Sequence, residues 1–496
     1  MTRIRQPLIA IRNKIRLALV AICLSFLAFT ASAAAAEFDV SLHEMQSLLR
    51  AGDFDALEKI LTGLEEAYEA GEISDTKLEH AHYAFASADP DLESSFSDWI
   101  KARPQSHHPY LARGIYHRYL GWMLRGADLP QRTPDERMAL MTGHFELAAS
   151  DLTTVLERKP NSGLAYSFLV DISLAVGRRD ILDTLLRAGL KADPNSFTLR
   201  RRYFGALTPW WGGGRTSNKD RLSALGNFVL GAQNQQYPVR VTDSMRSFTR
   251  EIVLDAPSNP ALQPLRGYLD FSVAEILRRN GRNLDAIKYY DKAIASGDYW
   301  YFRYQEGKNY YWMERYRDAI ASYDRALELW PDNPGTLERR AQAYRRLELY
   351  NKANADLDLA LSLDPKNPDL LREKAYTLRD SGRYEEAVSV LDDAFIYGEF
   401  DDFIWDARGR LYLYELKDPK RAIPDLKRTT ELDPANQRYW SNYGRALYAA
   451  RDCKAVDAFK KYLAVCPRFG NDCRESSMKF AREVIEYMSH PGHCGN

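Results

Sequence analysis

The sequence predicts an all-α fold, in which a solenoid of stacked helical hairpins follows an irregular α-helical region. The clearest hairpin covers residues 333–365, where two apolar-striped helical segments are joined by a short turn. Pro331 and Pro365 lie 34 residues apart, and the same pattern of small residues returns on both sides of this hairpin. A period of about 20–50 residues is typical of solenoids, because a single hairpin cannot bury both of its apolar faces without stacked neighbours.

The first 36 residues predict an export signal. Five basic residues and no acid come first, the apolar run 17–27 follows, and small residues continue to Ala36. This order is typical of a secretory signal, and it predicts cleavage near Ala36 and a periplasmic or secreted mature protein. The alternative is a retained membrane anchor, since residues 17–36 are long enough to span a bilayer.

The charge balance argues against a nucleic-acid partner. The 496-residue chain contains 68 Lys and Arg and 68 Asp and Glu residues. Loss of the signal removes five of the basic residues, which leaves 63 basic against 68 acidic residues. A slightly negative mature chain offers no broad basic face of the kind that binds nucleic acid.

Residues 37–260 are predicted to form an N-terminal α-helical domain. Ser41 can cap a first helix that Gly52 ends, and a second amphipathic helix closes at Gly71. One hairpin unit of the repeat type is expected at residues 160–194, because the bounding prolines are again 34 residues apart. The glycine-rich stretch from residue 200 to 267 is interpreted as a non-repeat insert or junction.

Residues 261–467 carry the repeat itself. Small residues recur where the two helices of a hairpin must approach closely, and a one-residue insertion interrupts the spacing in the fifth unit. In register, these residues are Ala274, Ala286 and Ala293; Gly307, Ala319 and Ala326; Ala341, Ala353 and Ala360; Ala375, Ala387 and Ala394; Gly409 and Ala422; and Gly444 and Ala455.

Aromatic residues accompany these small residues, with Tyr310, Tyr344 and Tyr412 in the first helix of a pair and Tyr290 and Tyr323 in the second. The combined pattern resembles the tetratricopeptide repeat over about residues 262–467. The resemblance implies a right-handed superhelix whose first helices line a concave groove. It also implies a non-enzymatic scaffold or adaptor that binds a protein segment in that groove.

Three features mark the region before the array: the Arg125-Gly126 helix end, the Ala-Asp-Pro segment that ends at Pro194, and the glycine-rich segment 209–214. Together they are similar to a bacterial domain family of unknown function, number 4034, over about residues 42–255. The family's Pro-Arg-Trp-Gly-Gly-Ser segment reads here Pro-Trp-Trp-Gly-Gly-Gly. This similarity implies no activity.

The positions that the tetratricopeptide resemblance places in the groove are rich in basic and aromatic residues. They predict a groove for an extended acidic segment, because arginine binds carboxylates through paired hydrogen bonds and tyrosine offers apolar faces. The alternative is that these residues are simply solvated on exposed helix faces. The candidate residues are Tyr301, Tyr304, Lys308, Tyr311, Arg345, Arg372, Tyr376, Arg379, Arg410, Arg438 and Arg445, accompanied by Glu338, Gln342, Asp369, Phe403, Asp406, Ser441 and Tyr448.

A candidate loop site outside the repeats consists of Trp210, Trp211, Gly212 and Gly213. Glycines let a backbone approach a ligand closely, and tryptophans present flat apolar area. The alternative is a structural corner that buries the tryptophans between two helical layers. A second functional hypothesis follows from this loop, in which the N-terminal half binds or processes an envelope polymer and the repeats only present it.

The cysteines that survive processing cluster in the last 44 residues, at Cys453, Cys466, Cys473 and Cys494. An even number in an exported chain predicts two disulfides with three possible connectivities. Cys453 with Cys466 would join the helices of the last repeat, and Cys473 with Cys494 would hold a capping helix within residues 468–496. The alternative is a zinc site formed by His490, His493, Cys494 and Cys473.

No catalytic centre, metal site or cofactor is predicted. The chain has no Gly-x-Ser-x-Gly motif, and the pairs His80 with His82 and His107 with His108 lack the spacing that puts two ligands on one helix face. We expect a protein or peptide partner with an acidic extended segment, and a cell-envelope polymer as the alternative partner. Membrane contact is expected only if the signal stays uncleaved.

Overall fold

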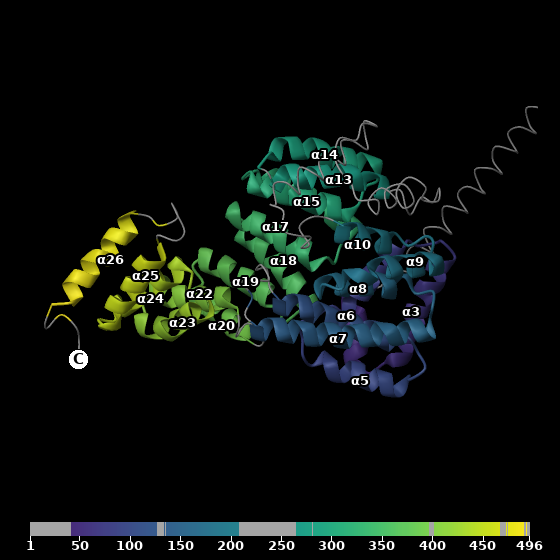
Figure 1. Ribbon diagram of the computed structural model, residues 1–496, viewed down its shortest axis with the longest axis horizontal. Coiled ribbons are helices and arrows are strands. Elements are labelled where there is room, and N and C mark those ends of the chain that lie inside the picture. Colours follow the sequence, from purple (N-terminus) through teal and green to yellow (C-terminus); the bar gives the residue numbers. More distant parts are fainter. Residues whose placement is uncertain are drawn as a thin grey trace, which may run out of the picture.

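The computed structural model describes residues 41–125, 133, 135–207, 264–279, 281–395, 401–466, 473, 475–490 and 493. Within these ranges there are helices and no strand, which confirms the predicted all-α fold (Figure 1). No helix in the described part of the chain is long and apolar enough to cross a membrane. The predicted export signal, the candidate loop at 210–213 and the predicted domain border at 260–261 lie outside the described residues.

The N-terminal domain begins with short helices whose ends depend on single residues. The Glu44 amide donates to Ser41 Oγ at 3.1 Å and so caps the first helix, which ends at Gly52 with φ 71°. The predicted cap at Ser41 and the predicted helix end at Gly52 are both confirmed. The apolar helix faces pack around the buried rings of Phe85 and Trp99. The elements are α2 (Leu42–Ala51), α3 (Phe54–Glu69), α4 (Asp75–His82), η1 (Tyr83–Phe85), α5 (Leu92–Ala102), α6 (His108–Arg125) and α7 (Asp135–Arg158).

Residues 160–194 contain α8 (Gly163–Ala175) and α9 (Leu182–Ala192), and α10 (Phe197–Leu207) packs on α8. The apolar core of these helices is not separate from that of the array. Leu186 and Phe197 belong to one buried cluster with Tyr290 and Phe302. The N-terminal domain therefore continues into the first repeat through a shared core.

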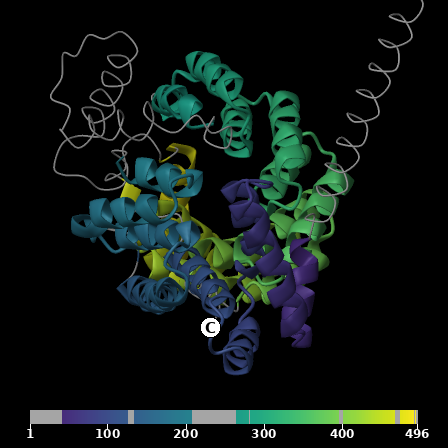
Figure 2. The same ribbon diagram turned by 90° about the vertical axis from the view of Figure 1, so that its right-hand side faces the viewer.

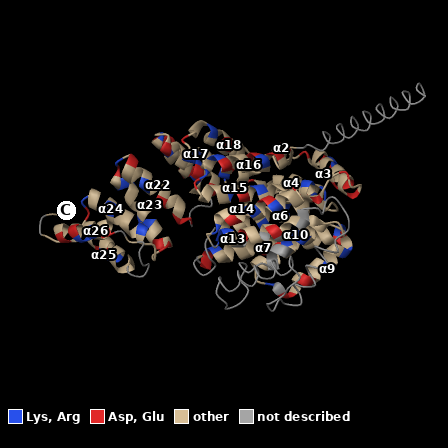
Figure 3. Cartoon of the chain, turned by 90° about the horizontal axis from the view of Figure 1, so that it is seen from above, with Lys and Arg blue, Asp and Glu red and all other residues tan. Residues whose placement is uncertain are grey.

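The array consists of successive helix pairs in which each helix packs on the next. In Figures 1 and 3 its C-terminal part, from α22 to the final helix α26 (Glu475–Met488), extends away from the N-terminal domain. The first helices are α13 (Pro264–Arg279), α15 (Trp300–Trp312), α17 (Pro334–Arg346), α19 (Pro368–Asp380), α22 (Asp402–Arg410) and α24 (Gln437–Ala449). The second helices are α14 (Asn283–Ser296), α16 (Tyr316–Leu329), α18 (Tyr350–Leu363), α20 (Tyr384–Asp393), α23 (Pro419–Leu432) and α25 (Lys454–Val465).

Small residues permit the close approach within each pair, as the sequence predicts. Ala341, Ala353 and Ala360 are fully buried in their unit. A methyl group added at Gly307 would lie 2.5 Å from a ring carbon of Tyr323, far inside van der Waals contact. Glycine therefore stands at this position because the second helix fills the space with a large ring.

The turn between the two helices of each unit contains one residue in the left-handed conformation. Glycine adopts this conformation without strain, whereas other residues adopt it at a cost. The positions and their φ values are Gly281 (74°), Glu314 (59°), Glu348 (60°), Gly382 (80°), Lys417 (55°) and Arg451 (59°).

The insertion predicted in the fifth unit takes the form of a π-helical turn. The left-handed residues Gly382 and Lys417 are 35 positions apart, one more than the 34 that separate Glu348 from Gly382. The extra residue lies in a π-helix over Leu411–Glu415, directly after α22. A π-turn absorbs one added residue without breaking the helix, so the stacking of the neighbouring units continues.

The N-terminal domain packs against the ends of the repeats, where a second helix passes to the next first helix. Asp364, which follows α18, accepts hydrogen bonds from the Ala88 amide at 2.6 Å and from Ser87 Oγ at 3.0 Å. Gln46 Nε2 donates to the carbonyl oxygen of Leu363 at 2.7 Å. Figure 2 shows the purple N-terminal helices beside the green helices of the array.

An aromatic contact extends this packing by one repeat. The imidazole of His80 stacks on Trp330, with ring centroids 3.8 Å apart and an interplanar angle of 7°. Tyr83 meets the same indole edge-on at 4.9 Å. The N-terminal domain is thus held along the array, and it also contacts the first helices α13 and α15, since Phe197 packs on Tyr268 and His80 lies against Trp300.

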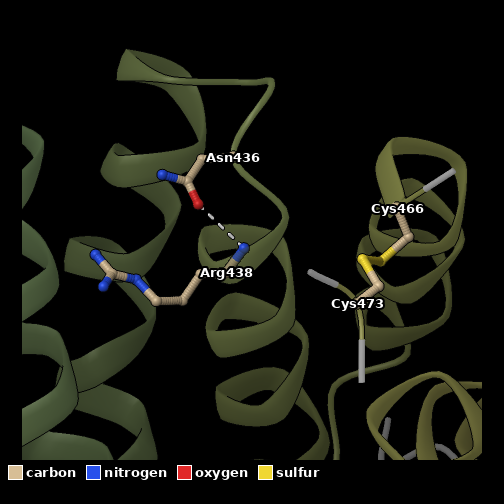
Figure 4. Close-up of a disulfide and its surroundings, with 4 residues drawn as sticks. All are labelled: Asn436, Arg438, Cys466 and Cys473. Carbon is tan, nitrogen blue, oxygen red and sulfur yellow. Dashed lines mark hydrogen bonds between the residues drawn. A yellow bond between two sulfur atoms is a disulfide. The ribbon is translucent and has the colours of Figure 1, made fainter. Parts of the chain in front are cut away.

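The C-terminal disulfide differs from the predicted pairing. Cys466 is bonded to Cys473, so the expected Cys453–Cys466 and Cys473–Cys494 bridges are wrong (Figure 4). Cys453 is also disulfide-bonded. The observed bridge joins the end of α25 to the segment before α26. The alternative zinc site is wrong as well, because Cys473 has no free thiolate to offer.

Candidate functional site on the first helices of the repeats

The predicted groove residues of α15 form an aromatic cluster with one lysine. The rings of Tyr301 and Tyr304 stack with centroids 6.0 Å apart, and Gln305 Nε2 donates to the Tyr301 hydroxyl at 2.8 Å. Lys308 Nζ lies 5.3 Å from the centroid of the Tyr304 ring, one helical turn away. One helix thus presents a tyrosine pair and an ammonium group side by side.

Lys308 lies among positive charges. Burial, together with Arg339 and Arg278, lowers the pKa of Lys308 to about 8. Arg339 in α17 donates from Nη1 to Gln342 Oε1 at 2.9 Å, and its Nε is buried with no hydrogen-bond partner among the described residues. Within the same part of the chain, no carboxylate forms an ion pair with Lys308. The charge of Glu275 acts on Lys308 and that of Glu338 acts on Arg339, so the two residues form a cationic centre in which Lys308 has no ion-pair partner among the described residues.

The predicted arginines further along are already paired within the protein. Arg345 Nε lies 2.7 Å from Glu373 Oε1, and its Nη1 lies 2.7 Å from Asp380 Oδ2. Arg379 Nη2 also lies 2.6 Å from Asp380 Oδ1. Glu373 and Asp380 both belong to α19, so Arg345 connects one repeat to the next.

Arg372 and Phe403 continue this surface toward the C-terminal units. Arg372 Nη2 lies 2.6 Å from Asp369 Oδ1, its Nη1 lies 3.6 Å from Asp401 Oδ2, and its guanidinium carbon lies 5.7 Å from the centre of the Phe403 ring. Tyr376 lies between two guanidinium groups, with Arg379 at 5.1 Å and Arg345 at 5.8 Å from its ring centroid. The cations here stack on aromatic rings as well as pairing with acids.

In the last units, two of the predicted basic residues lie close to the carboxylate of Asp406. Arg438 Nη2 lies 3.3 Å and Arg410 Nη1 3.5 Å from Asp406 Oδ2, and Asn442 Nδ2 donates to Oδ1 at 3.0 Å. The Arg438 amide also donates to Asn436 Oδ1 at 3.1 Å, which caps α24 (Figure 4). Arg438 and Asn442 therefore link α24 to α22, whereas the Arg410 pair lies within α22.

Arg445 and Tyr448 face the final helix. The Arg445 guanidinium carbon lies 4.5 Å from the centre of the Phe480 ring in α26, and Tyr448 meets the same ring at 5.8 Å. The C-terminal end of the candidate surface is therefore covered by α26.

The candidate residues lie on the first helices α15, α17, α19, α22 and α24, and we call this set of side chains the first-helix face. It is defined by Tyr301, Tyr304, Lys308, Tyr311, Arg339, Arg345, Arg372, Tyr376, Arg379, Arg410 and Arg438. Sequence reasoning missed the carboxylates Glu373, Asp380 and Asp401 and the guanidinium of Arg339. Lys and Arg alternate with Asp and Glu along the array (Figure 3), and helical spacing alone does not report which of them meet between repeats.

Two family models match the chain. A domain of unknown function, DUF4034, matches residues 41–200, and a tetratricopeptide repeat model matches residues 304–368, 338–398 and 407–468. The chain thus contains tetratricopeptide repeats within residues 304–468 and a match to DUF4034 before them. The DUF4034 match ends before the glycine-rich segment 209–214, although the resemblance expected from the sequence extends to about residue 255.

Solved structures of tetratricopeptide repeat proteins are similar to this chain. A tetratricopeptide repeat protein from Parabacteroides merdae is 18% identical, with 54% of this chain and 99% of that chain covered and a TM-score of 0.37. YrrB, described as having an unusual peptide-binding site, is 20% identical, with 39% and 97% covered and a TM-score of 0.31. MamA is 21% identical, with 33% and 95% covered and a TM-score of 0.30. No curated protein matches in sequence.

The DUF4034 domain contains a histidine cluster that the spacing of histidines along one helix does not predict. His107 Nε2 lies 2.9 Å from Glu65 Oε1, and His108 Nδ1 lies 4.0 Å from the same oxygen. Lys159 Nζ lies 2.6 Å from Glu65 Oε2. The adjacent histidines come from the start of α6 and the glutamate from α3, so their meeting depends on helix packing.

The protonation of this cluster follows from its surroundings. Burial raises the pKa of Glu65, but the hydrogen bond to His107 and the charges of His108, His107 and Lys159 outweigh burial and lower it to about 2. Burial lowers the pKa of His108 to about 3, although the charge of Glu65 opposes this shift. At neutral pH the carboxylate is ionised and the imidazole of His108 is neutral.

A cavity of about 470 Å³ lies beside this cluster in the DUF4034 domain. Its wall includes Glu65, Tyr68, Asp75, Lys159 and Asp193. The Tyr68 hydroxyl donates to Asp193 Oδ2 at 2.8 Å. The cavity is therefore polar, and it offers more carboxylates than cations.

Proposed function

We propose that this protein is an exported scaffold that binds a partner protein through its first-helix face. Tetratricopeptide repeats support the broader statement of a protein-interaction scaffold. The first helices contribute aromatic and cationic side chains from unit after unit, and a long continuous surface of this kind suits an extended segment of another chain. No catalytic role is assigned to this face.

The observation that carries the proposal is the cationic centre of Lys308 and Arg339 beside the Tyr301 and Tyr304 rings. An acidic group of the partner would neutralise the charges of Lys308 and Arg339 together. The tyrosines would pack against the apolar part of the same segment. We therefore place the acidic part of the partner at α15 and α17.

The remainder of the first-helix face has a different role in this proposal. Arg345, Arg372 and Arg438 already have carboxylate partners. A partner carboxylate would have to displace Glu373, Asp369 or Asp406, which costs part of the binding free energy. We infer that this stretch contacts the partner through Tyr376, Phe403 and polar groups, and that the ion pairs hold the repeats in register.

The test compares two synthetic peptides of equal length, one rich in Asp and Glu and one with Asn and Gln in their place. Fluorescence anisotropy should show tighter binding of the acidic peptide, and binding should weaken from pH 7 to pH 9 as Lys308 loses its charge. Lys308→Gln with Arg339→Gln should weaken binding at least about tenfold. The control Lys288→Gln removes an exposed lysine of α14 and should bind like wild type. Equal binding of the two peptides would contradict the proposed chemistry.

Export is a further part of this proposal. The first 36 residues have the pattern of a secretory signal, and the Cys466–Cys473 disulfide supports an oxidising compartment. Cell fractionation should place the protein outside the cytoplasm with an N-terminus near residue 37. A full-length protein in the cytoplasmic fraction would contradict this part.

The cavity of the DUF4034 domain supports the second candidate function, binding of an envelope polymer. Carboxylates and hydroxyls such as those of Asp193 and Tyr68 suit the hydroxyl groups of a glycan. Because the apolar core runs from α9 into α14, the test requires the full chain. Tyr68→Ala with Asn161→Ala should abolish sedimentation with purified cell-wall polymer, whereas unchanged sedimentation would remove this candidate.

A further inference from the structure

The structure assigns a metal site to Glu65, His107 and His108. We propose that these residues bind one divalent transition-metal ion, with zinc as the preferred ion. The potential ligand atoms of the three residues lie within 4.8 Å of one another. Two imidazole nitrogens and one carboxylate oxygen are the donor set of three-ligand zinc sites. This set disfavours magnesium and calcium, which bind oxygen ligands.

The orientation of His108 is the second observation. Its Nε2 lies 3.2 Å from Thr62 Oγ1, so one ring nitrogen has a hydrogen-bond partner. Its Nδ1 is buried and has no hydrogen-bond partner among the described residues. Metal-bound histidines typically donate their second ring N–H to a protein group, which fixes the tautomer and leaves the other nitrogen with a lone pair. With Nε2 donating to Thr62, the Nδ1 lone pair is available to a metal.

Glu65 is arranged to use its two oxygens differently. Lys159 holds Oε2, His107 Nε2 lies near both oxygens at 2.9 and 3.0 Å, and Oε1 is the oxygen that also lies 4.0 Å from His108 Nδ1. The bond from His107 to Oε1 explains why the carboxylate lies at this place, but it leaves His108 Nδ1 without a role. A metal ion bound to Oε1 and both imidazoles would satisfy all three groups.

The observed separations need a small adjustment to hold zinc. Ligand bonds of about 2.0–2.2 Å place tetrahedral donor atoms roughly 3.3–3.5 Å apart. The distance of 2.9 Å from His107 to Glu65 Oε1 is slightly short, and that of 4.0 Å from His108 is slightly long. A carboxylate shift of about half an ångström toward His108 would equalise them. Because Glu65 also lines the cavity, a solvent molecule there would complete the coordination.

The experiment uses the full-length protein after dialysis against a chelator. Calorimetric titration with Zn²⁺ should give one site per chain, Co²⁺ should give the visible absorption of a tetrahedral complex, and Mg²⁺ should give no heat. Zinc should also raise the melting temperature, since it binds only the folded state. Absence of zinc binding by the wild-type protein would overturn the proposal regardless of how any variant folds.

Substitutions of the proposed ligands test whether zinc binds at Glu65, His107 and His108. His108→Ala and Glu65→Gln should each weaken zinc binding at least about a hundredfold. The control His43→Ala removes an exposed histidine of the same domain, and His490→Ala with His493→Ala removes the two histidines near the C-terminus. Both controls should bind zinc like wild type. Circular dichroism checks the fold of each variant, and a folded His108→Ala variant with wild-type affinity would overturn the proposal, as would loss of binding in the C-terminal variant.

Discussion

The guanidinium of Arg345 in one repeat binds the carboxylate of Glu373 in the next, with Nε and Oε1 2.7 Å apart. Glu373 is buried, with 8% of its side chain exposed, and Arg345 is 16% exposed. This pair therefore links two units across their interface as well as facing the candidate surface. Loss of one partner would leave a largely buried charge without compensation.

Arg345→Ala should lower the free energy of unfolding by about 2 kcal/mol, because Glu373 loses its main counter-charge. The double variant Arg345→Met with Glu373→Met should recover most of this loss, since two apolar side chains replace the pair. Urea denaturation followed by circular dichroism measures both. Arg315→Ala breaks an exposed ion pair with Asp318 and should leave the urea midpoint nearly unchanged. If Arg345→Ala behaves like this control, the pair does not stabilise the interface.

Gly307→Ala should destabilise the protein by about 1–3 kcal/mol, because the added methyl group would meet the Tyr323 ring at 2.5 Å. Gly335→Ala is the matched control, since the nearest atom to its added methyl group is 3.6 Å away. The control should be neutral or slightly stabilising. Thermal and urea unfolding of the two variants measure the difference. Equal stability of both would contradict the close packing at Gly307.

Glu348→Gly should stabilise the protein by about 0.5–1 kcal/mol. Glu348 has φ 60°, a conformation that costs an L-residue about 1–2 kcal/mol, and glycine avoids this cost while losing more chain entropy on folding. The equivalent position in the next unit is Gly382 with φ 80°, so Gly382→Ala should have the opposite effect. Urea midpoints of the two variants should move in opposite directions from wild type. A shift in the same direction would refute the strain argument.

Asp75 should make a pH-dependent contribution to stability. Burial raises the pKa of Asp75 to about 6, although hydrogen bonds from Thr198 oppose the shift. A carboxyl group with a raised pKa in the folded state favours folding at low pH, and this contribution is lost as the pH rises through 6. Asp75→Asn should therefore gain about 2 kcal/mol relative to wild type between pH 4.5 and 7.5.

The comparison with the variant isolates Asp75 from other titrating groups. Burial lowers the pKa of His80 to about 3, and a histidine with a lowered pKa loses its contribution as the pH falls below 6.5. His80 is present in both proteins, so its effect cancels in the difference. Urea unfolding of both proteins across this pH range gives the result. A constant difference would show that Asp75 has the same pKa in the folded and unfolded states.

Local sequence signals predicted the repeat architecture well. Small residues at fixed spacing identify the helix contacts, and Ser41 and Gly52 mark helix ends, because each depends only on residues within a few positions. The insertion before Ala422 was visible as a change of spacing. Its π-helical form over Leu411–Glu415 could not be predicted, because a bulge within a helix and a longer turn change the spacing of the small residues equally.

Contacts between residues that are far apart in the sequence could not be predicted from it. Gln46 meets Leu363 across 317 positions, and no local pattern reports such a contact. The same limit applies to Glu373 opposite Arg345 and to Glu65 beside His107. The Cys466–Cys473 bridge was missed because the pairing was inferred from helix partners, whereas the two cysteines are only seven positions apart.

Site-specific photocrosslinking in intact cells tests the central claim most directly. A photoreactive residue at Tyr304 or Tyr376, on the first-helix face, should crosslink the same partner protein. The same residue at Leu284 or Leu359, exposed on the second helices α14 and α18, should not crosslink it. Crosslinks from both first-helix positions and neither second-helix position agree with binding through the first-helix face. Crosslinks of that partner only from Leu284 or Leu359 would contradict it.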